Sequence, residues 1–479
     1  MERNWHAPAW FLDGKFGIFI HWGVYSVAAR QSEWYPRHIY LTPGIAAWHR
    51  AQFGDRAGYK DLVPLFKAEK FDARAWARLF REAGAKYVMP VAEHHDGFAL
   101  WDSALTRWDA KDMGPHRDLI GELAAACRAE GLRFGVSYHR MEHWSFMYPR
   151  SGLENDIFDP AFADFYGPPQ PAPAEGRPAG DEEVMNGRAT PQSAAFLEEW
   201  LRRGQELIDR YEPDMVYFDN GVNGRGLDPI KLRFAAYYYN RAAAWGREVA
   251  LATKGINATE GPAYLHGSVL DFERGHPSDI RPGAWQTDTT VHHRWGYLED
   301  TLYRSTGTLI RELIDNVSKG GNLLLNFAPR ADGTFPEEQV AILRGMGRWL
   351  ALNGEAIYGT RPWARYGEGP SQFNNPGNLS EADRIHREAV GDVWLPAYTG
   401  RDFRFTRKGD TLYAVAMAWP GQGTALITSL AGRSADAVEL LGHGPVPFTV
   451  TPDGLRLTLP ATKPGEHAYA FKITGLQNL

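Results

Sequence analysis

The sequence predicts an α/β fold: a (β/α)8 TIM-like barrel followed by a C-terminal antiparallel β-sandwich. Eight apolar runs alternate with mostly helical patterns, as parallel strands joined by crossover helices require. The runs are apolar along their length, as strands buried on both faces must be. After about residue 355 the pattern changes to short strand-like runs separated by Gly, Pro and Asp, which is typical of a sandwich. A doubly wound open sheet is the alternative to the barrel.

Each element of the barrel is expected from its own pattern. The stretch DARAWARLFREAG at 72–84 is a predicted helix, because apolar residues recur at helical spacing and Gly84 ends it. The predicted strands are 15–23, 86–95, 132–140, 214–221, 248–255, 268–275, 284–290 and 322–329. The other predicted helices are 117–131, 192–211, 230–246, 300–319 and 336–352.

Two domains are expected, a catalytic barrel at 1–355 and a β-sandwich at 356–479. Within the first, 146–192 is a long loop insertion that contains the Pro- and Gly-rich run GPPQPAPAEGRPAG. The sequence leaves open whether this insertion is a lid over the site or a flexible loop. In the second, RDFRFTRKGDTLYAVAMAWP at 401–420 predicts a hairpin that turns at KGD.

The composition excludes several classes of function. There are 52 basic against 58 acidic residues, a net charge of −6, so we expect no nucleic-acid or membrane partner. The one cysteine, Cys127, excludes an intramolecular disulfide. The first residues lack a signal-peptide pattern, so the default expectation is cytoplasmic, or periplasmic or secreted if a leader was removed.

Polar residues end nearly every predicted strand, where the loops of a barrel converge on its catalytic face. Burying each of them unpaired would cost several kcal/mol, so their recurrence indicates a site. They are His21, Glu93, His94, His95, Asp96, His139, Asp219, Lys254, Asp271 and Glu273.

Three chemistries could use this ring: a metal site, recognition of a polyol, and glycoside hydrolysis by a carboxylate pair. On a regular strand the adjacent His94 and His95 would point to opposite faces, so they converge only if the strand end is irregular. We therefore expect no metal, and a sugar site with two catalytic carboxylates.

The motifs identify a family. KFGIFIHWGVYSV, AGAKYVMPVAEHHDGFALWDS, YEPDMVYFDNG, LIDNVSKGGNLLLNFAPRADGT and NGEAIYGTRPW, in this order, resemble the blocks of the α-L-fucosidases of glycoside hydrolase family 29. The resemblance implies a catalytic barrel with a β-sandwich, and retaining, exo-acting hydrolysis of terminal α-L-fucosyl residues without a metal or other cofactor. The implied substrate is a fucosylated oligosaccharide or glycoconjugate.

The resemblance also implies roles for single residues. Asp219 in VYFDNG matches the nucleophile, and Glu273 in LDFERG is the expected acid/base, with Asp271 as its rival. Gln286 is excluded as the acid/base, because an amide cannot donate a proton usefully. The positions that match or adjoin the fucose-binding residues are His21, Glu33, Trp34, His94, His95, His139, Tyr217 and Lys254.

Two alternatives stay open: a catalytically inactive fucose-binding protein, and a glycosidase for a related sugar such as an α-L-galactoside. The presence of both Asp219 and Glu273 favours the enzyme. The linkage preference, transfucosylation and a homo-oligomeric state are not fixed by the sequence.

Overall fold

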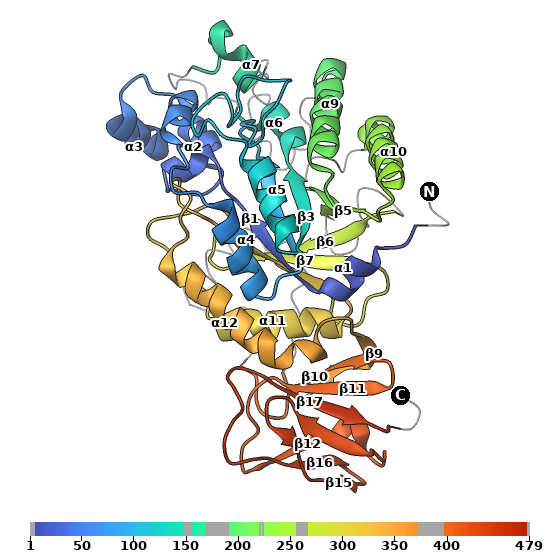
Figure 1. The fold of residues 1–479 in the computed structure, drawn as a ribbon. Coiled ribbons are helices and arrows are strands. Elements are labelled where there is room, and N and C mark those ends of the chain that lie inside the picture. Colours follow the sequence, from blue (N-terminus) through green and yellow to red (C-terminus); the bar gives the residue numbers. More distant parts are fainter. Residues whose placement is uncertain are drawn as a thin grey trace, which may run out of the picture.

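Eight parallel strands close into a barrel in the computed structural model (Figure 1). The structure describes residues 5–147, 156–167, 191–219, 222, 225–254, 267–371 and 397–476. Each strand pairs with the next along the chain, and β1 pairs with β8 to close the cylinder. The strands are β1 (Phe16–Ile20), β2 (Tyr87–Glu93), β3 (Arg133–Tyr138), β4 (Met215–Phe218), β5 (Ala250–Lys254), β6 (Val269–Glu273), β7 (Trp285–Thr290) and β8 (Asn322–Phe327). The predicted barrel and all eight predicted strands are confirmed.

Apart from β7, which is largely polar, the strands are mainly apolar because both of their faces are covered. In β1, Phe16 and Ile18 belong to the core between strands and helices, whereas Phe19 packs in the barrel interior. Gly17 lies between Phe16 and Ile18 in the sequence, and a Cβ atom on Gly17 would come 2.3 Å from the Tyr87 ring. A small residue at this position therefore lets β1 approach β2.

Four of the six helices that cover the barrel, α4, α5, α9 and α11, begin where a side chain caps them. Asp72 accepts from the backbone N–H of Ala75, and Ser305 from that of Thr308. The helix predicted at 300–319 consequently begins later, at Thr306. The covering helices are α4 (Ala73–Glu82), α5 (Leu119–Ala129), α9 (Ala194–Tyr211), α10 (Asp228–Trp245), α11 (Thr306–Ser318) and α12 (Glu337–Asn353).

Shorter helices lie in the loops, and the sequence patterns did not predict them. They are α1 (Ala9–Gly14), α2 (Tyr35–Leu41), α3 (Pro43–Phe53), α6 (Arg140–Phe146) and α7 (Ala163–Tyr166), with 3-10 turns η1 (Val24–Val27), η2 (Tyr59–Leu65), η3 (Pro160–Phe162), η4 (Arg225–Leu227), η5 (Gly354–Ala356) and η6 (Thr428–Leu430). The segment expected as a loop, 146–192, thus holds η3 and α7. Its run at 168–190 lies outside the described residues.

The C-terminal part consists of two antiparallel sheets around a separate apolar core. The hairpin predicted at 401–420 is present, with Lys408 opposite Thr411 across the turn. The six-stranded sheet has the order β14 (Gly444–Pro445), β13 (Ala437–Leu440), β17 (Tyr469–Thr474), β11 (Thr411–Ala416), β10 (Phe403–Lys408) and β9 (Arg361–Glu368). The three-stranded sheet has the order β12 (Thr424–Ile427), β16 (Gly454–Thr458) and β15 (Phe448–Thr451).

Helices α11 and α12 lie between the barrel and the sandwich (Figure 1). A buried ionic cluster joins the two parts: Asp315 of α11 lies 2.6 Å from Nε of Arg404 of β10 and 2.7 Å from Nζ of Lys319. The cluster fixes the sandwich to the side of the barrel. None of the described helices is long and apolar enough to cross a membrane.

Candidate active site

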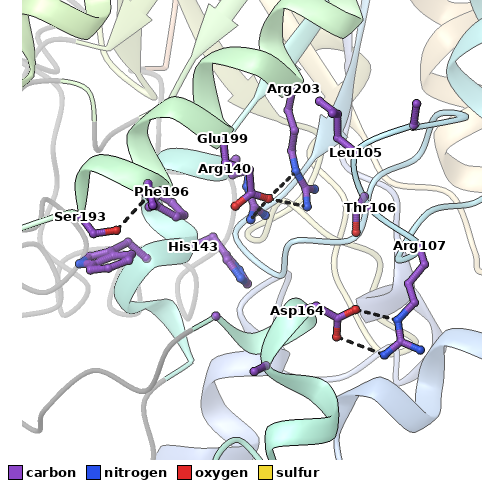
Figure 2. Close-up of a pocket in the computed structure, with 15 residues that line it drawn as sticks. Leu105, Thr106, Arg107, Arg140, His143, Asp164, Ser193, Phe196, Glu199 and Arg203 are labelled. Carbon is purple, nitrogen blue, oxygen red and sulfur yellow. Dashed lines mark hydrogen bonds and ion pairs between the residues drawn. The ribbon is translucent and has the colours of Figure 1, made fainter.

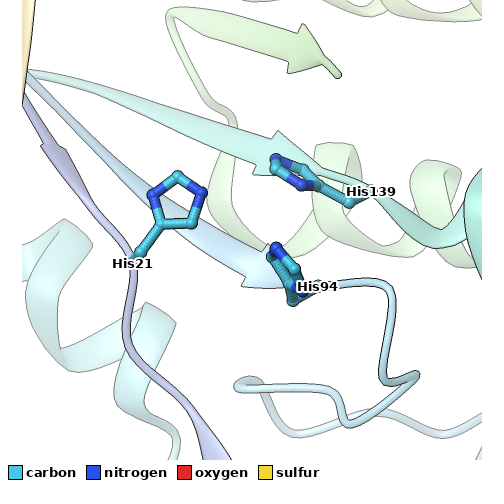
Figure 3. Close-up of side chains that lie close together, drawn as sticks. All are labelled: His21, His94 and His139. Atoms are coloured by element: carbon cyan, nitrogen blue, oxygen red, sulfur yellow. The ribbon is translucent and has the colours of Figure 1, made fainter. Parts of the chain in front are cut away.

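Three imidazoles meet at the carboxyl ends of neighbouring strands (Figure 3). His21 follows β1, His94 follows β2 and His139 follows β3, and all three are buried. The centroids of their rings lie 5.1–5.8 Å apart. Strand ends that are far apart in the sequence therefore build one wall of a site.

The end of β2 is irregular, as the convergence of His94 with His95 requires. The register of β2 against β3 shifts between Val91 and Glu93. The centroids of the two imidazoles lie only 4.1 Å apart, so both rings face the same region. Their acidic neighbours turn elsewhere: Glu93 pairs with Arg140 at 2.7 Å, and Asp96 accepts from the hydroxyl of Tyr59.

Asp219 lies directly after β4 and is surrounded by nitrogen atoms. Its Oδ1 is 2.6 Å from Nζ of Lys254, and its Oδ2 is 3.3 Å from Nδ1 of His139 and 3.7 Å from Nε2 of His95. Burial alone would raise the pKa of Asp219. The charge of Lys254 outweighs burial and lowers the pKa below the usual range. Asp219 is thus a carboxylate at neutral pH.

Lys254 joins Asp219 to the second predicted catalytic carboxyl group. Its Nζ lies 2.6 Å from Asp219 and 3.1 Å from Oε2 of Glu273. These two oxygens must therefore lie within about 6 Å of each other, compared with roughly 5–5.5 Å between the carboxyl groups of retaining glycosidases. Asp288 also approaches Lys254, at 3.6 Å, so burial of the ammonium is outweighed and the pKa of Lys254 rises.

Asp271 and Glu273, the rival candidates for the acid/base, occupy different environments. The Asp271 carboxyl accepts from Nε2 of Gln286 at 2.7 Å, and Gln286 in turn accepts from Tyr87 inside the barrel. Burial, with the nearby Asp288, raises the pKa of Asp271 well above its usual value. The Glu273 side chain is 20% exposed and reaches Lys254. Only Glu273 of this pair therefore lies where both solvent and Asp219 are within reach.

Neighbouring groups fix the orientation of two of the imidazoles. Nδ1 of His21 lies 2.8 Å from Oδ1 of Asn326, and Nε2 of His139 lies 2.5 Å from Oγ of Ser137. Burial lowers the pKa of His21 to about 4 and that of His94 and His139 well below their usual value. These three rings are neutral at pH 7, so each has one donor and one acceptor nitrogen, which suits recognition of hydroxyl groups.

The remaining predicted residues lie around this wall or beneath it. Oε2 of Glu33 accepts from the backbone N–H groups of Trp295 and Gly296, which fixes the loop after β7. Trp34 is partly exposed, and its ring centroid is 6.1 Å from that of His95. Tyr217 is fully buried and donates to Asp288 at 3.2 Å. The structure therefore brings the predicted residues together, with Tyr217 one layer deeper.

Two buried carboxyl groups in the site were missed by the sequence analysis. Glu142 on α6 has Oε2 3.0 Å from Nε2 of His95, and Asp288 lies inside β7 beside Lys254. The sequence contains a feature that points to each of these two carboxyl groups. Asp288 is a charged residue within the strand predicted at 284–290. Glu142 follows His139 by three residues, which is about one helical turn.

Within the described ranges of the chain, two overlapping groups could hold a metal ion. His21, His94 and His139 offer ligand atoms within 4.8 Å of one another, and so do His95, His139 and Asp219. Imidazole and carboxylate are ligands for Zn²⁺. In the second group, however, the ammonium of Lys254 already neutralises Asp219.

A cavity of about 620 Å³ lies on the other side of α6 (Figure 2). Arg140 and Arg203 reach toward Glu199 on this side, each at 2.9 Å. His143 of the same helix lines the cavity too, with Nδ1 2.8 Å from the backbone oxygen of His95. Helix α6 therefore separates this cavity from the site, and Glu142 is the residue that α6 contributes to the site.

Two family models match this chain, and known proteins and solved structures are similar to it. The family model "Alpha-L-fucosidase" matches residues 2–355, and "Alpha-L-fucosidase C-terminal domain" matches 393–474. The chain is 30% identical to the tissue alpha-L-fucosidase of Homo sapiens, over 98% of this chain and 90% of that protein. It is 32% identical to the plasma alpha-L-fucosidase of Pongo abelii, over 91% of this chain and 82% of that protein. Among solved structures, the Thermotoga maritima alpha-fucosidase in complex with fucose is similar, with a TM-score of 0.75 and 28% identity over 98% of this chain and 97% of that one.

Proposed function

Since this chain belongs to the α-L-fucosidase family, we propose that it is a retaining, exo-acting α-L-fucosidase whose substrates are fucosylated oligosaccharides or glycoconjugates. The observation that carries the proposal is the placement of Asp219 and Glu273 around one ammonium group. Both carboxyl groups lie within 3.1 Å of Nζ of Lys254. This closeness favours the double-displacement mechanism, because an inverting enzyme needs roughly 6.5–9.5 Å between its carboxyl groups to admit a water molecule.

In the proposed first step, Asp219 attacks the anomeric carbon of the terminal fucosyl unit. A bond forms between a carboxylate oxygen and that carbon while the bond to the aglycone oxygen breaks, and Glu273 gives its proton to the departing oxygen. In the second step Glu273 takes a proton from water, the water oxygen attacks the anomeric carbon, and Asp219 is released as a carboxylate. Each step inverts the anomeric carbon, so the product keeps the α configuration.

The sugar itself would be held by the wall of imidazoles. Since Asn326 engages Nδ1 of His21 and Ser137 engages Nε2 of His139, each of these two rings offers its other nitrogen to a sugar hydroxyl. His94 adds a third neutral ring beside them. Glu33 adds a carboxylate, and the partly exposed Trp34 offers an apolar surface for the C–H groups of the ring. Lys254 would keep Asp219 ionised, and Tyr217 would support Asp288 from below.

The test is chemical rescue of Asp219→Gly with azide on an aryl α-L-fucoside. The variant should lose turnover by about 10⁴-fold or more, as nucleophile removal does elsewhere. Azide should then restore cleavage of the aryl group and give β-L-fucosyl azide, because a single displacement inverts the anomeric carbon. Asp102→Gly is the matched control, because Asp102 is 44% exposed and pairs with Arg210 away from the site.

Three outcomes would contradict the proposal. Near-normal turnover by Asp219→Gly would remove Asp219 as the nucleophile. An absence of fucoside cleavage by the wild type, together with measurable fucose binding, would favour a sugar-binding protein. Faster turnover of the aryl α-L-galactoside than of the fucoside would change the substrate.

A further inference from the structure

We propose that a cavity at the amino ends of the barrel strands, lined by the buried side chain of Lys15, binds a small organic anion that carries a carboxylate or phosphate group. The proposal goes beyond the proposed function and does not depend on it, because no residue of the candidate active site lines this cavity.

The cavity lies at the opposite end of the barrel from the candidate active site. Its volume is about 590 Å³, within the range of roughly 300–1,000 Å³ for small-molecule sites. Lys15, Ala284 and Gly320 lie just before the neighbouring strands β1, β7 and β8. Arg361 and Trp363 of β9 line it from the sandwich, and Figure 1 shows α1 on the side of the barrel that faces the sandwich. The active site lies at the carboxyl ends of the strands, so the length of the barrel separates the two.

The Lys15 side chain is the feature that calls for an anion. Lys15 is only 2% exposed, and no hydrogen bond or ion pair joins its ammonium group to another residue that the structure describes. Its main chain is held by the barrel, because its backbone oxygen accepts from the N–H group of Leu323 in β8. A buried ammonium group without an anion is costly, so this position favours either a neutral amine or a bound anion.

The other charges around Lys15 leave the cavity positive. Asp13 of α1 is close enough to act on Lys15, but its carboxylate pairs with Nη1 of Arg361 at 2.8 Å. Among the described residues that line the cavity there is no Asp or Glu, whereas Lys15, Arg281 and Arg361 are cationic side chains. The lining therefore complements a negatively charged ligand.

The electrostatics of Lys15 make this binding sensitive to pH. Burial, and then the charge of Arg361, lower the pKa of Lys15 to about 7, and Asp13 opposes them. A bound anion would favour the ammonium form, so binding near pH 7 should take up a proton. The charged and titratable groups around Lys15 are Asp13 of α1, Arg361 of β9, and Arg281 and His6 on the other walls of the cavity.

Two tryptophans give the cavity apolar walls. Trp363 is buried, and the centroid of its ring lies 5.2 Å from that of Phe405. Trp5 is partly exposed on the opposite strand-leading segment. Aromatic faces suit the C–H groups or the ring of an organic molecule. The expected ligand is therefore a carboxylate or phosphate ester with an apolar or ring-shaped body.

The test is calorimetric titration of the full chain with benzoate and with phenyl phosphate at pH 6.5. At least one probe should bind, and the tighter of the two identifies the preferred charged group. Lys15→Met should weaken this binding by about tenfold or more, because a charge-assisted hydrogen bond is lost. Lys70→Met is the matched control, since Lys70 is 64% exposed and pairs with Asp332. Absence of binding of both probes, or wild-type affinity in Lys15→Met, would overturn the proposal.

The pH dependence of the affinity identifies the lysine as the group that holds the anion. Benzoate stays ionised between pH 6.5 and 8.5, whereas the ammonium form of Lys15 becomes scarce. The affinity of the wild type for benzoate should therefore fall by about tenfold or more over this range. His6→Gln should keep this dependence, and an affinity of the wild type that does not change with pH would overturn the proposal.

A second variant keeps the test decisive if Lys15→Met does not fold. Arg281→Gln removes a cation from a half-buried position of the wall and should weaken binding by about two- to fivefold. Folded Lys15→Met should unfold at the same temperature as the wild type or higher, because a buried cation without an anion is removed. Its turnover of an aryl α-L-fucoside should stay unchanged. Unchanged affinity in Arg281→Gln, or lost turnover in Lys15→Met with unchanged benzoate binding, would overturn the proposal.

Discussion

Two of the buried ionic clusters in the described part of the chain are built differently. At the contact between barrel and sandwich, Asp315 is surrounded by Lys319, Arg404 and His276, and each of its oxygens has a partner within 3.2 Å. At the mouth of the barrel, acids outnumber cations: Asp219, Glu273 and Asp288 share Lys254. The fully paired cluster around Asp315 stabilises the contact between barrel and sandwich. At the mouth of the barrel three carboxyl groups share Lys254, so carboxyl oxygens remain that can act on a ligand.

The largest expected effect separates activity from stability at the mouth of the barrel. Asp219→Asn should lower kcat/KM by about 10⁴-fold, equivalent to about 5.5 kcal/mol of transition-state stabilisation. The free energy of unfolding should change far less, because Lys254 keeps Glu273 and Asp288 as partners. Steady-state kinetics and urea unfolding of the same preparation measure both. A loss of stability as large as the loss of activity would show that the two clusters do not differ.

The second-largest effect is expected at the contact between barrel and sandwich, where a substitution should lower stability and leave activity unchanged. Asp315→Asn should lower the free energy of unfolding by about 3–5 kcal/mol, because Lys319 and Arg404 are then buried without their anion. Since the folded pKa of Asp315 is lowered, its contribution is present above the unfolded pKa of about 3.9 and is lost as the pH falls. The variant should therefore show a flatter dependence of stability on pH in acid. A change in the kcat of the folded Asp315→Asn variant would contradict the expectation that this cluster affects stability and not activity.

A smaller effect is expected when the shared cation is removed. Lys254→Met takes away the main group that lowers the pKa of Asp219 against burial, so this pKa should rise. The nucleophile must be ionised, and the acidic limb of kcat/KM should therefore move up by about one pH unit or more. Arg233→Met, which removes a cation from the exposed face of α10, should leave the limb in place.

The smallest effect should come from the apolar wall. Trp34→Phe keeps an aromatic surface but reduces its area, so KM for an aryl α-L-fucoside should rise by about two- to tenfold, within the range for aromatic contacts. The kcat value should stay close to that of the wild type. A large fall in kcat with unchanged KM would assign Trp34 a role other than holding the sugar.

The sequence patterns predicted the barrel well because most of its strands are apolar along their length and four of the covering helices begin at a capping side chain, whereas β7 is largely polar. They did not predict α2 and α3, which contact each other through Tyr35 and His49 and reach a distant segment through Tyr40 and Asp156. The partners Glu93 and Arg140 also escaped prediction, since a side chain's direction after an irregular strand end depends on its neighbours in space.

Within the site, the family resemblance supplied the positions of Asp219 and Glu273, and the structure brings both to Lys254. Glu142 escaped because it joins the site through a contact with His95, 47 positions away in the sequence. The sequence places Glu142 one helical turn after His139, but it carries no signal for the contact with His95 itself.

The central claim is that Asp219 and Glu273 cleave the glycosidic bond in two displacements. The most direct test is ¹H NMR of the first sugar released from an aryl α-L-fucoside, recorded before mutarotation. The account predicts that the α anomer of L-fucose accumulates first and then equilibrates with the β anomer. Initial release of the β anomer would show a single displacement and would contradict the account.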